Sequence, residues 1–323
     1  MYRKIAAIVL PTLFAAIILG WMLFSIWGQL LEAFAHIVPQ YLALAVIICS
    51  AGWVIRGWRY QTILVSMDNK VSLRTSTGCI LVSQTVNLVV PFRIGDFVRI
   101  FILNHEYDTR YSDGVSSIVV ERVFDVATVA LLGLAALPFV IGADPSYFTV
   151  IVAVLGLCAA FFVFLLFAGR FRSENKYIRI ILSMLHEIRR ASLSFRSVIV
   201  LGCSSVVIWL FDIFACISVV MMFKQEVSFA TVVFAIVVGN LIKAVPITPG
   251  GLGTYEFLVA RTFALAGMQE PYANLIAIID HLIKNLVTLA GGIISMYFFG
   301  DWVMPTIKKV FRTRLDGGTD SGP

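Results

Sequence analysis

The chain has 323 residues, of which 59% are hydrophobic and 14% are charged, and its formal net charge at pH 7 is +6. Soluble domains carry about 25% charged residues, so this composition excludes an ordinary soluble protein and predicts an all-α, polytopic membrane protein. In such a protein lysine and arginine collect in cytoplasmic loops, so the positive charge does not indicate a nucleic-acid partner.

Apolar segments long enough to cross a bilayer recur along the chain. Six full spans are predicted, near residues 5–28, 41–64, 114–141, 147–168, 197–222 and 273–299. Two further apolar regions, near 73–104 and 228–268, are each interrupted by proline and glycine near the middle. We treat residues 1–304 as a single transmembrane domain and residues 305–323 as a disordered cytoplasmic tail.

Basic residues predict the side of the membrane on which each loop lies. Arg3 and Lys4 place the N-terminus in the cytoplasm, and the last span ends there too, before the basic stretch "KKVFRTR". The loop after the second span is placed in the cytoplasm by Arg56, Arg59, Lys70 and Arg74. With these assignments, each interrupted region must return to the side from which it started, as a re-entrant hairpin does.

The order span, interrupted region, span occurs twice, in opposite directions, over residues 41–141 and 197–299. "NLVVPFRIG" and "NLIKAVPITPG" also share Asn-Leu followed by Pro-x-x-x-Gly. We therefore expect an inverted repeat, an arrangement that points to a transport site near the membrane midplane. The residues expected to break the helices are Pro91, Gly95, Pro246, Pro249, Gly250, Gly251 and Gly253.

Residues 170–196 form a basic cytoplasmic loop that contains an amphipathic stretch. Ile178, Ile181, Leu182, Leu185 and Ile188 share one helical face. This face either rests on the anionic inner leaflet or packs against the helix bundle.

The first cluster of charges lies beside the first break, in "PFRIGDFVR". Arg93, Asp96 and Arg99 can share one face of a helix, and two arginines near a helix break suit a phosphate. The alternative is ordinary cytoplasmic loop charge. We expect the headgroup of a ligand to contact Arg93, Asp96, Arg99, Asn87 and Asn240.

Two other clusters are predicted to form ion pairs that act as a gate. In "VVERVFDV", Arg122 can pair with Asp125, which leaves Glu121 for an arginine of the first cluster; a purely structural ion network is the alternative. The third cluster surrounds the second break, and its members are Lys243, Glu256, Arg261, Asp280 and Lys284. There Asp280 and Lys284 can pair along one helix, Glu256 can meet Lys243 or Lys284, and Asp212 needs a partner.

Catalytic and metal-binding motifs are not recognised. Five cysteines lie in apolar segments without a C-x-x-C pair, and four histidines lack ligand spacing, so neither a metal nor a cofactor is expected. "GGLG" lacks the G-K-[ST] of a nucleotide loop, and His281 is interpreted as a core residue.

The motifs "PFRIGDFVR", "ERVFD" and "PITPGGLGTYE", in this order, resemble the lysylphosphatidylglycerol synthase transmembrane (flippase-like) family, which includes the flippase region of the multiple peptide resistance factor. The resemblance runs from about residue 42 to 299, and Asp96 replaces the glutamate usual in the family. It implies lipid translocation. We expect the flippase half alone, without an aminoacyl transferase domain, so that activity is not carried over.

Three functions therefore remain open at this stage. The first is a flippase or transporter of an anionic or isoprenoid-linked lipid, in the cell membrane, with membrane lipids as partners and the protein a possible homo-oligomer. The second is a membrane-embedded transferase acting on a lipid-linked sugar or phosphate. The third is a scaffold for membrane proteins.

Overall fold

The computed structural model describes residues 13, 16–24, 27–28, 37–90, 92–140, 144–171, 174–244, 248–303 and 305. The regular structure of these residues is helical throughout. Half of the first expected span, the tail 306–323 and the expected break residues Pro91 and Pro246 lie outside them.

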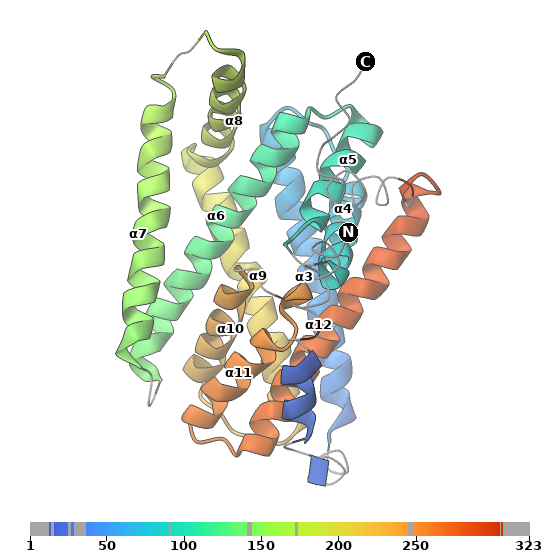
Figure 1. The fold of residues 1–323 in the computed structure, drawn as a ribbon, viewed down its shortest axis with the longest axis vertical. Helices are drawn as coiled ribbons and strands as arrows, with labels where there is room; N and C mark the ends of the chain where they lie inside the picture. Colours follow the sequence, from blue (N-terminus) through green and yellow to red (C-terminus); the bar gives the residue numbers. More distant parts are fainter. Residues whose placement is uncertain are drawn as a thin grey trace.

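The helices, labelled as in Figure 1, follow one another with short connections. They are α3 (Pro39–Ser66), α4 (Leu73–Val89), α5 (Gly95–Tyr107), α6 (Tyr111–Ala136), η1 (Leu137–Phe139), α7 (Pro145–Ala168), α8 (Lys176–Ser192), α9 (Phe195–Met222), α10 (Phe229–Ala244), η2 (Pro249–Gly251), α11 (Thr254–Leu265) and α12 (Glu270–Phe299).

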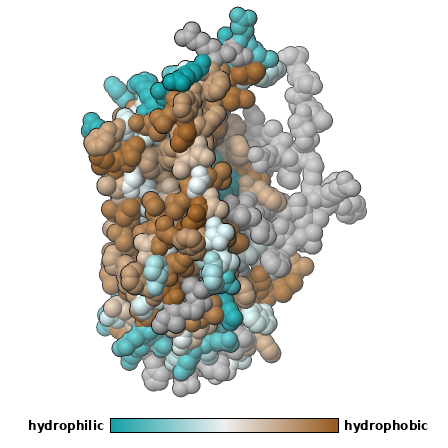
Figure 2. Space-filling model, turned by 90° about the vertical axis from the view of Figure 1, so that its left-hand side faces the viewer, coloured by the Kyte–Doolittle hydropathy of each residue, from teal (hydrophilic) through white to brown (hydrophobic). Residues whose placement is uncertain are grey.

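Four of the described helices, α3, α7, α9 and α12, are long and apolar enough to cross a membrane. The span expected at 114–141 corresponds to α6, which has 26 residues but carries three charged residues, Glu121, Arg122 and Asp125, in its middle. It nevertheless runs over the same height as α7 (Figure 1). Figure 2 shows a broad hydrophobic surface between hydrophilic ends, as a bilayer requires.

Both interrupted regions are pairs of helices that fold back on themselves. Thr75 at the start of α4 hydrogen-bonds Tyr107 at the end of α5, with 3.0 Å between the two hydroxyl oxygens. In the second pair the Nζ of Lys243 on α10 lies 4.0 Å from the ring centre of Tyr255 on α11. The first hairpin lies toward the upper end of Figure 1 and the second toward the lower end.

The two breaks differ in the type of residue that adopts a left-handed backbone conformation. Phe92 and Arg93 adopt left-handed φ angles of 65° and 53°, a conformation that costs roughly 1–3 kcal/mol for each non-glycine residue. At the second break the left-handed positions are glycines, Gly250, Gly251 and Gly253, which adopt it without a steric penalty. The first tip is therefore strained and the second is not.

Helix α3 runs antiparallel to α9 through the centre of the molecule. The N–H of Val38, before α3, donates to the carbonyl oxygen of Met222 at the end of α9. Farther along, Arg56 pairs with Asp212 at 2.7 Å, and Arg59 donates to the hydroxyl of Ser205. Both arginines lie within α3, as the expected span at 41–64 places them, and their side chains face the interior.

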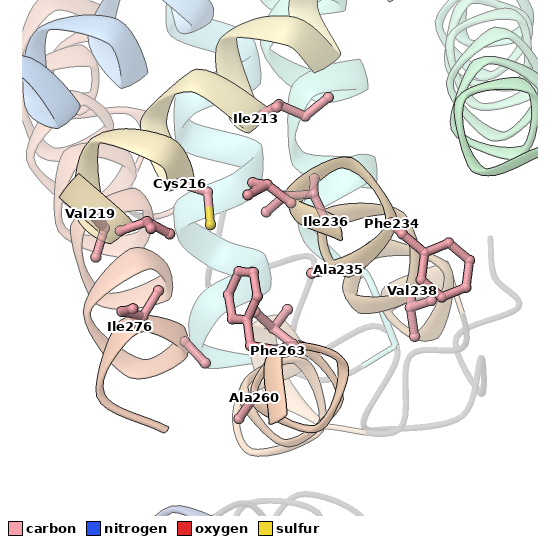
Figure 3. Close-up of a cluster of buried hydrophobic side chains, with 14 of the residues drawn as sticks. Ile213, Cys216, Val219, Phe234, Ala235, Ile236, Val238, Ala260, Phe263 and Ile276 are labelled. Atoms are coloured by element: carbon pink, nitrogen blue, oxygen red, sulfur yellow. The ribbon is translucent and has the colours of Figure 1, made fainter. Parts of the chain in front are cut away.

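A hydrophobic cluster fixes the second hairpin against α9 and α12. Figure 3 shows Phe263 of α11 directed toward side chains of α9 and α10, with Ile276 of α12 beside them. Phe263 and Ile276 are both fully buried. Packing of this kind holds the position of the second break relative to α9 and α12.

Helix α8 contains the predicted amphipathic stretch and packs against the bundle at one end, as one of the two alternatives has it. Ile188 and Ala191, near its C-terminus, are buried against the bundle. Ile178 and Ile181, near its N-terminus, are 46% and 57% exposed. The helix thus packs with one end and leaves apolar surface at the other.

Candidate functional site

The tips of the two hairpins meet near the middle of the molecule. A Cβ atom on Gly250 of η2 would lie 2.9 Å from Cδ2 and 3.4 Å from Cα of Leu88 on α4. Leu88, at the end of α4 beside the first break, and Gly250, 162 residues later in the second break, are thus close neighbours. Their proximity is the geometry that a shared site at the breaks requires.

A cavity of about 490 Å³ lies at this junction, within the roughly 300–1,000 Å³ typical of small-molecule sites. Both breaks and eight helices, α3 to α6 and α9 to α12, contribute to its wall. Of the residues expected to act, those that line it are Asn87, Arg93, Asp96, Glu121, Arg122, Asp125, Asn240, Lys243, Gly250, Gly251 and Lys284.

Residues of α3, α5 and α6 form a network that we call the arginine–carboxylate cluster: Arg59, Arg93, Asp96, Arg99, Glu121, Arg122 and Asp125. Both terminal nitrogens of Arg59 donate hydrogen bonds to the two carboxylate oxygens of Asp125, at 2.6 and 3.1 Å. Arg122 reaches the same carboxylate only at 3.8 Å. The expected Arg122–Asp125 pair is therefore the weaker one, and Arg59 is the main partner.

Glu121 pairs with an arginine of the first motif, as predicted. Arg99 Nη1 donates to Glu121 Oε2 at 2.7 Å, and the Arg99 side chain is fully buried. Arg99 does not line the cavity, so in this conformation it cannot contact a headgroup directly. It holds Glu121 in place, while Arg122, at 3.4 Å from Glu121, faces the cavity.

Asp96 ties the first break to α4. Its Oδ1 accepts from Ser83 and from the Asn87 amide at 3.0 and 3.2 Å, and Arg93 Nε donates to its Oδ2 at 3.2 Å. The side-chain carbonyl oxygen of Asn87 in turn accepts a hydrogen bond from the backbone N–H of Gly95 at 2.7 Å. Asn87 and Asp96 therefore stabilise the broken backbone, while Arg93, 30% exposed, remains at the cavity wall.

The cluster around the second break, which we call the second cluster, contains Tyr255, Glu256, Asp280, His281 and Lys284. Lys284 contacts Asp280 at 2.9 Å, as predicted, and Tyr255 donates to Asp280 Oδ2 at 2.7 Å. Glu256 meets His281 at 2.7 Å, so the expectation that it meets Lys243 or Lys284 is wrong. Glu256 and Asp280 are buried behind the cavity.

Asp212 does not pair with a residue near the second break, where a partner for it was expected. It pairs with Arg56 across the α3–α9 interface and not with the second cluster. Sequence reasoning missed Arg56, Arg59 and His281 as network members. The available signal was that both arginines fall inside an apolar span, where a charge needs a partner.

The balance of charge at the cavity is positive. Five basic residues line the cavity, against four acidic ones: Arg56, Arg93, Arg122, Lys243 and Lys284 against Asp96, Glu121, Asp125 and Asp212. The ammonium group of Lys243 makes no ion pair with any described residue and lies over the ring of Tyr255. Arg93, Arg122 and Lys243 are therefore the cations best placed to meet an anion.

Comparisons with known proteins agree with the resemblance found in the motifs. A profile of the family described as "Lysylphosphatidylglycerol synthase TM region" matches residues 8–292. Glycosyltransferase AglD of Haloferax volcanii is 31% identical over 307 residues, which cover 80% of this chain but only 49% of that protein. The chain thus spans about half the length of this relative.

Two UPF0104 membrane proteins of Methanothermobacter thermautotrophicus are 25% and 24% identical and match over 88% and 90% of their own lengths. No solved structure matches the chain significantly. Because the profile covers most of the sequence and the apolar helices agree with it, this chain is an integral membrane protein that belongs to the lysylphosphatidylglycerol synthase transmembrane-region family.

Proposed function

We propose that the protein is a lipid transporter of the flippase type, which moves an anionic or isoprenoid-linked lipid across the membrane. The observation that carries this proposal is the cavity where two broken helices meet, with an excess of positive charge inside an apolar bundle. Arg93, Arg122 and Lys243 bind the anionic headgroup. Arg99, behind the cavity wall, holds Glu121, and Glu121 positions Arg122.

An inverted repeat underlies this proposal, and the helix lengths support it. Helices α3 to α6 have 28, 17, 13 and 26 residues, and α9 to α12 have 28, 16, 12 and 30. The packing is matched as well: α4 lies against α12 as α10 lies against α6. Antiparallel α3 and α9 give the halves opposite directions, as transporters with inverted repeats have.

The proposed membrane orientation follows from the same arrangement. The hairpins α4–α5 and α10–α11 enter from opposite faces and meet at the midplane. The face that carries α8 and its basic residues is cytoplasmic, because lysine and arginine concentrate on that side. Both chain termini are assigned to this face.

Transport can be tested in vesicles that contain the purified protein. A fluorescent anionic phospholipid should become accessible to a quencher on the opposite side faster than in protein-free vesicles. Lys243→Gln and Arg93→Gln should slow this movement about tenfold, since a hydrogen bond to a charged group contributes about 1.5–3 kcal/mol. Lys176→Gln, an exposed change on α8, is the matched control. Equal rates for all four proteins and for empty vesicles would refute the proposal.

A membrane-embedded transferase is the second candidate, because one relative bears the name of a glycosyltransferase. Its cavity carboxylates, such as Asp125, would then act on a lipid-linked sugar. Mass spectrometry of lipids incubated with the pure protein separates the two functions: a transporter leaves the mass of each lipid unchanged, whereas a transferase alters it.

A further inference from the structure

Uncharged polar side chains form a second part of the cavity wall. Gln84 of α4, Asn240 of α10 and Asn285 of α12 all line it, and we call them the amide wall. The side-chain amides of Gln84 and Asn285 make no hydrogen bond to any described residue. Asn240 donates to the Ile236 carbonyl oxygen at 2.8 Å, which leaves its own carbonyl oxygen as an acceptor.

A phosphate alone does not account for the amide wall. Phosphate oxygens mainly accept hydrogen bonds, whereas a side-chain amide offers two donors and an acceptor oxygen. Unpaired acceptors in a confined site are matched by a ligand that also donates, as hydroxyl groups do. The amide wall therefore favours a headgroup rich in hydroxyl groups.

Aromatic side chains complete the same wall. Trp53 of α3, Trp209 of α9 and Tyr255 of α11 line the cavity. The indole nitrogens of both tryptophans are buried and have no hydrogen-bond partner among the described residues. The apolar face of an indole ring suits a sugar ring, whose C–H faces are also apolar.

The size of the cavity also exceeds what a phosphate needs. Its volume of about 490 Å³ corresponds to roughly 16 water molecules at about 30 Å³ each. A phosphate on Lys243 and Arg93 would leave most of this space open. A phosphate joined to a sugar would extend from the cations onto the amide wall.

The charge of the site disfavours a cationic headgroup. Arg93, Arg122 and Lys243 would repel an aminoacyl lipid, and the cavity carboxylates Glu121 and Asp125 are already held by buried arginines. On the basis of the proposed transport function, we infer that the headgroup is a sugar phosphate, with its phosphate on these cations and its sugar on the amide wall.

Binding of soluble probes tests the two halves of the headgroup separately. Purified protein in lipid nanodiscs should bind a hexose 1-phosphate about tenfold tighter than inorganic phosphate, a difference of about 1.4 kcal/mol. Gln84→Leu and Asn285→Leu should abolish this preference and leave phosphate affinity unchanged. Gln269→Leu, which changes an exposed amide outside the cavity, should retain it. Equal affinities for the two probes in the unaltered protein would overturn the inference.

Vesicle assays then distinguish a lipid-linked sugar phosphate from a soluble one. A polyprenyl phosphohexose should cross faster than phosphatidylglycerol, and lysylphosphatidylglycerol should be slowest. If phosphatidylglycerol or the lysyl lipid is fastest, the sugar inference fails while lipid transport stands. If hexose 1-phosphate binds but no lipid moves, the lipid-linked form is overturned together with the proposed transport function.

Discussion

Gly250→Ala should separate the effect of contact between the hairpin tips from the effect of backbone strain. Gly250 has a φ of +61°, and an added Cβ would lie 2.9 Å from Leu88 Cδ2 and 3.4 Å from Leu88 Cα. Gly267 also has a positive φ, +93°, but a Cβ there would meet nothing within 4 Å. Gly267→Ala is therefore a matched control for the strain alone.

The magnitudes follow from these two environments. A left-handed backbone costs a non-glycine residue about 1–2 kcal/mol, which is the whole effect expected for Gly267→Ala. Gly250→Ala should add the cost of overpacking, about 1–3 kcal/mol. We expect the low end of that range, because Leu88 Cδ2 is the end of a flexible side chain and can move away.

The assay is chemical unfolding of both variants in the same detergent, followed by transport in vesicles. Gly250→Ala should be less stable than Gly267→Ala by about 1 kcal/mol and should also slow transport, whereas Gly267→Ala should not. Leu88→Ala should recover part of the stability lost in Gly250→Ala, since it removes the clashing atom. If the two alanine variants are equally stable and Leu88→Ala recovers nothing, the tips do not press on each other and the reasoning is wrong.

Two further predictions concern the scaffold around the tips. Arg56→Met or Asp212→Asn alone should destabilise the protein by up to about 3 kcal/mol, whereas the double variant should be about as stable as the original protein. A double-mutant cycle of unfolding free energies measures this. Additive losses of stability would argue against the ion pair. Gly95→Ala should prevent folding, because the added Cβ would overlap the Ser83 carbonyl oxygen. Gly156→Ala is the control, since its Cβ would meet open space and the variant should express normally. Similar yields of folded protein from the two variants would contradict this prediction.

Much of the architecture could be predicted because it follows from local chemistry. A bilayer fixes the length of an apolar helix, so α7 and α9 lie close to their expected bounds. Proline and glycine interrupt helices locally, so both breaks fall where the sequence places them. The Asp280–Lys284 pair was predictable because it joins residues four apart on one helix.

Partners on different helices could not be predicted in the same way. Arg59 could face several carboxylates, and only the packing of α3 against α6 and α9 selects Asp125 and Ser205. The Glu256–His281 contact likewise depends on how α11 lies against α12. Positive charge near a span end predicts the side of the adjoining loop, but it does not predict which buried carboxylate Arg59 contacts.

The distribution of polar contacts bears on how the proposed transporter opens. The carboxylates at the first tip are bound by residues of the first half, and those beneath the second tip by residues of the second half. Between the tips themselves, the described residues show the apolar contact of Leu88 with Gly250 and no ion pair. Separating the tips would therefore break no buried salt bridge, whose loss typically costs about 3–5 kcal/mol. The antiparallel α3–α9 pair, joined by Arg56 and Asp212, would stay intact as the axis about which the hairpins move.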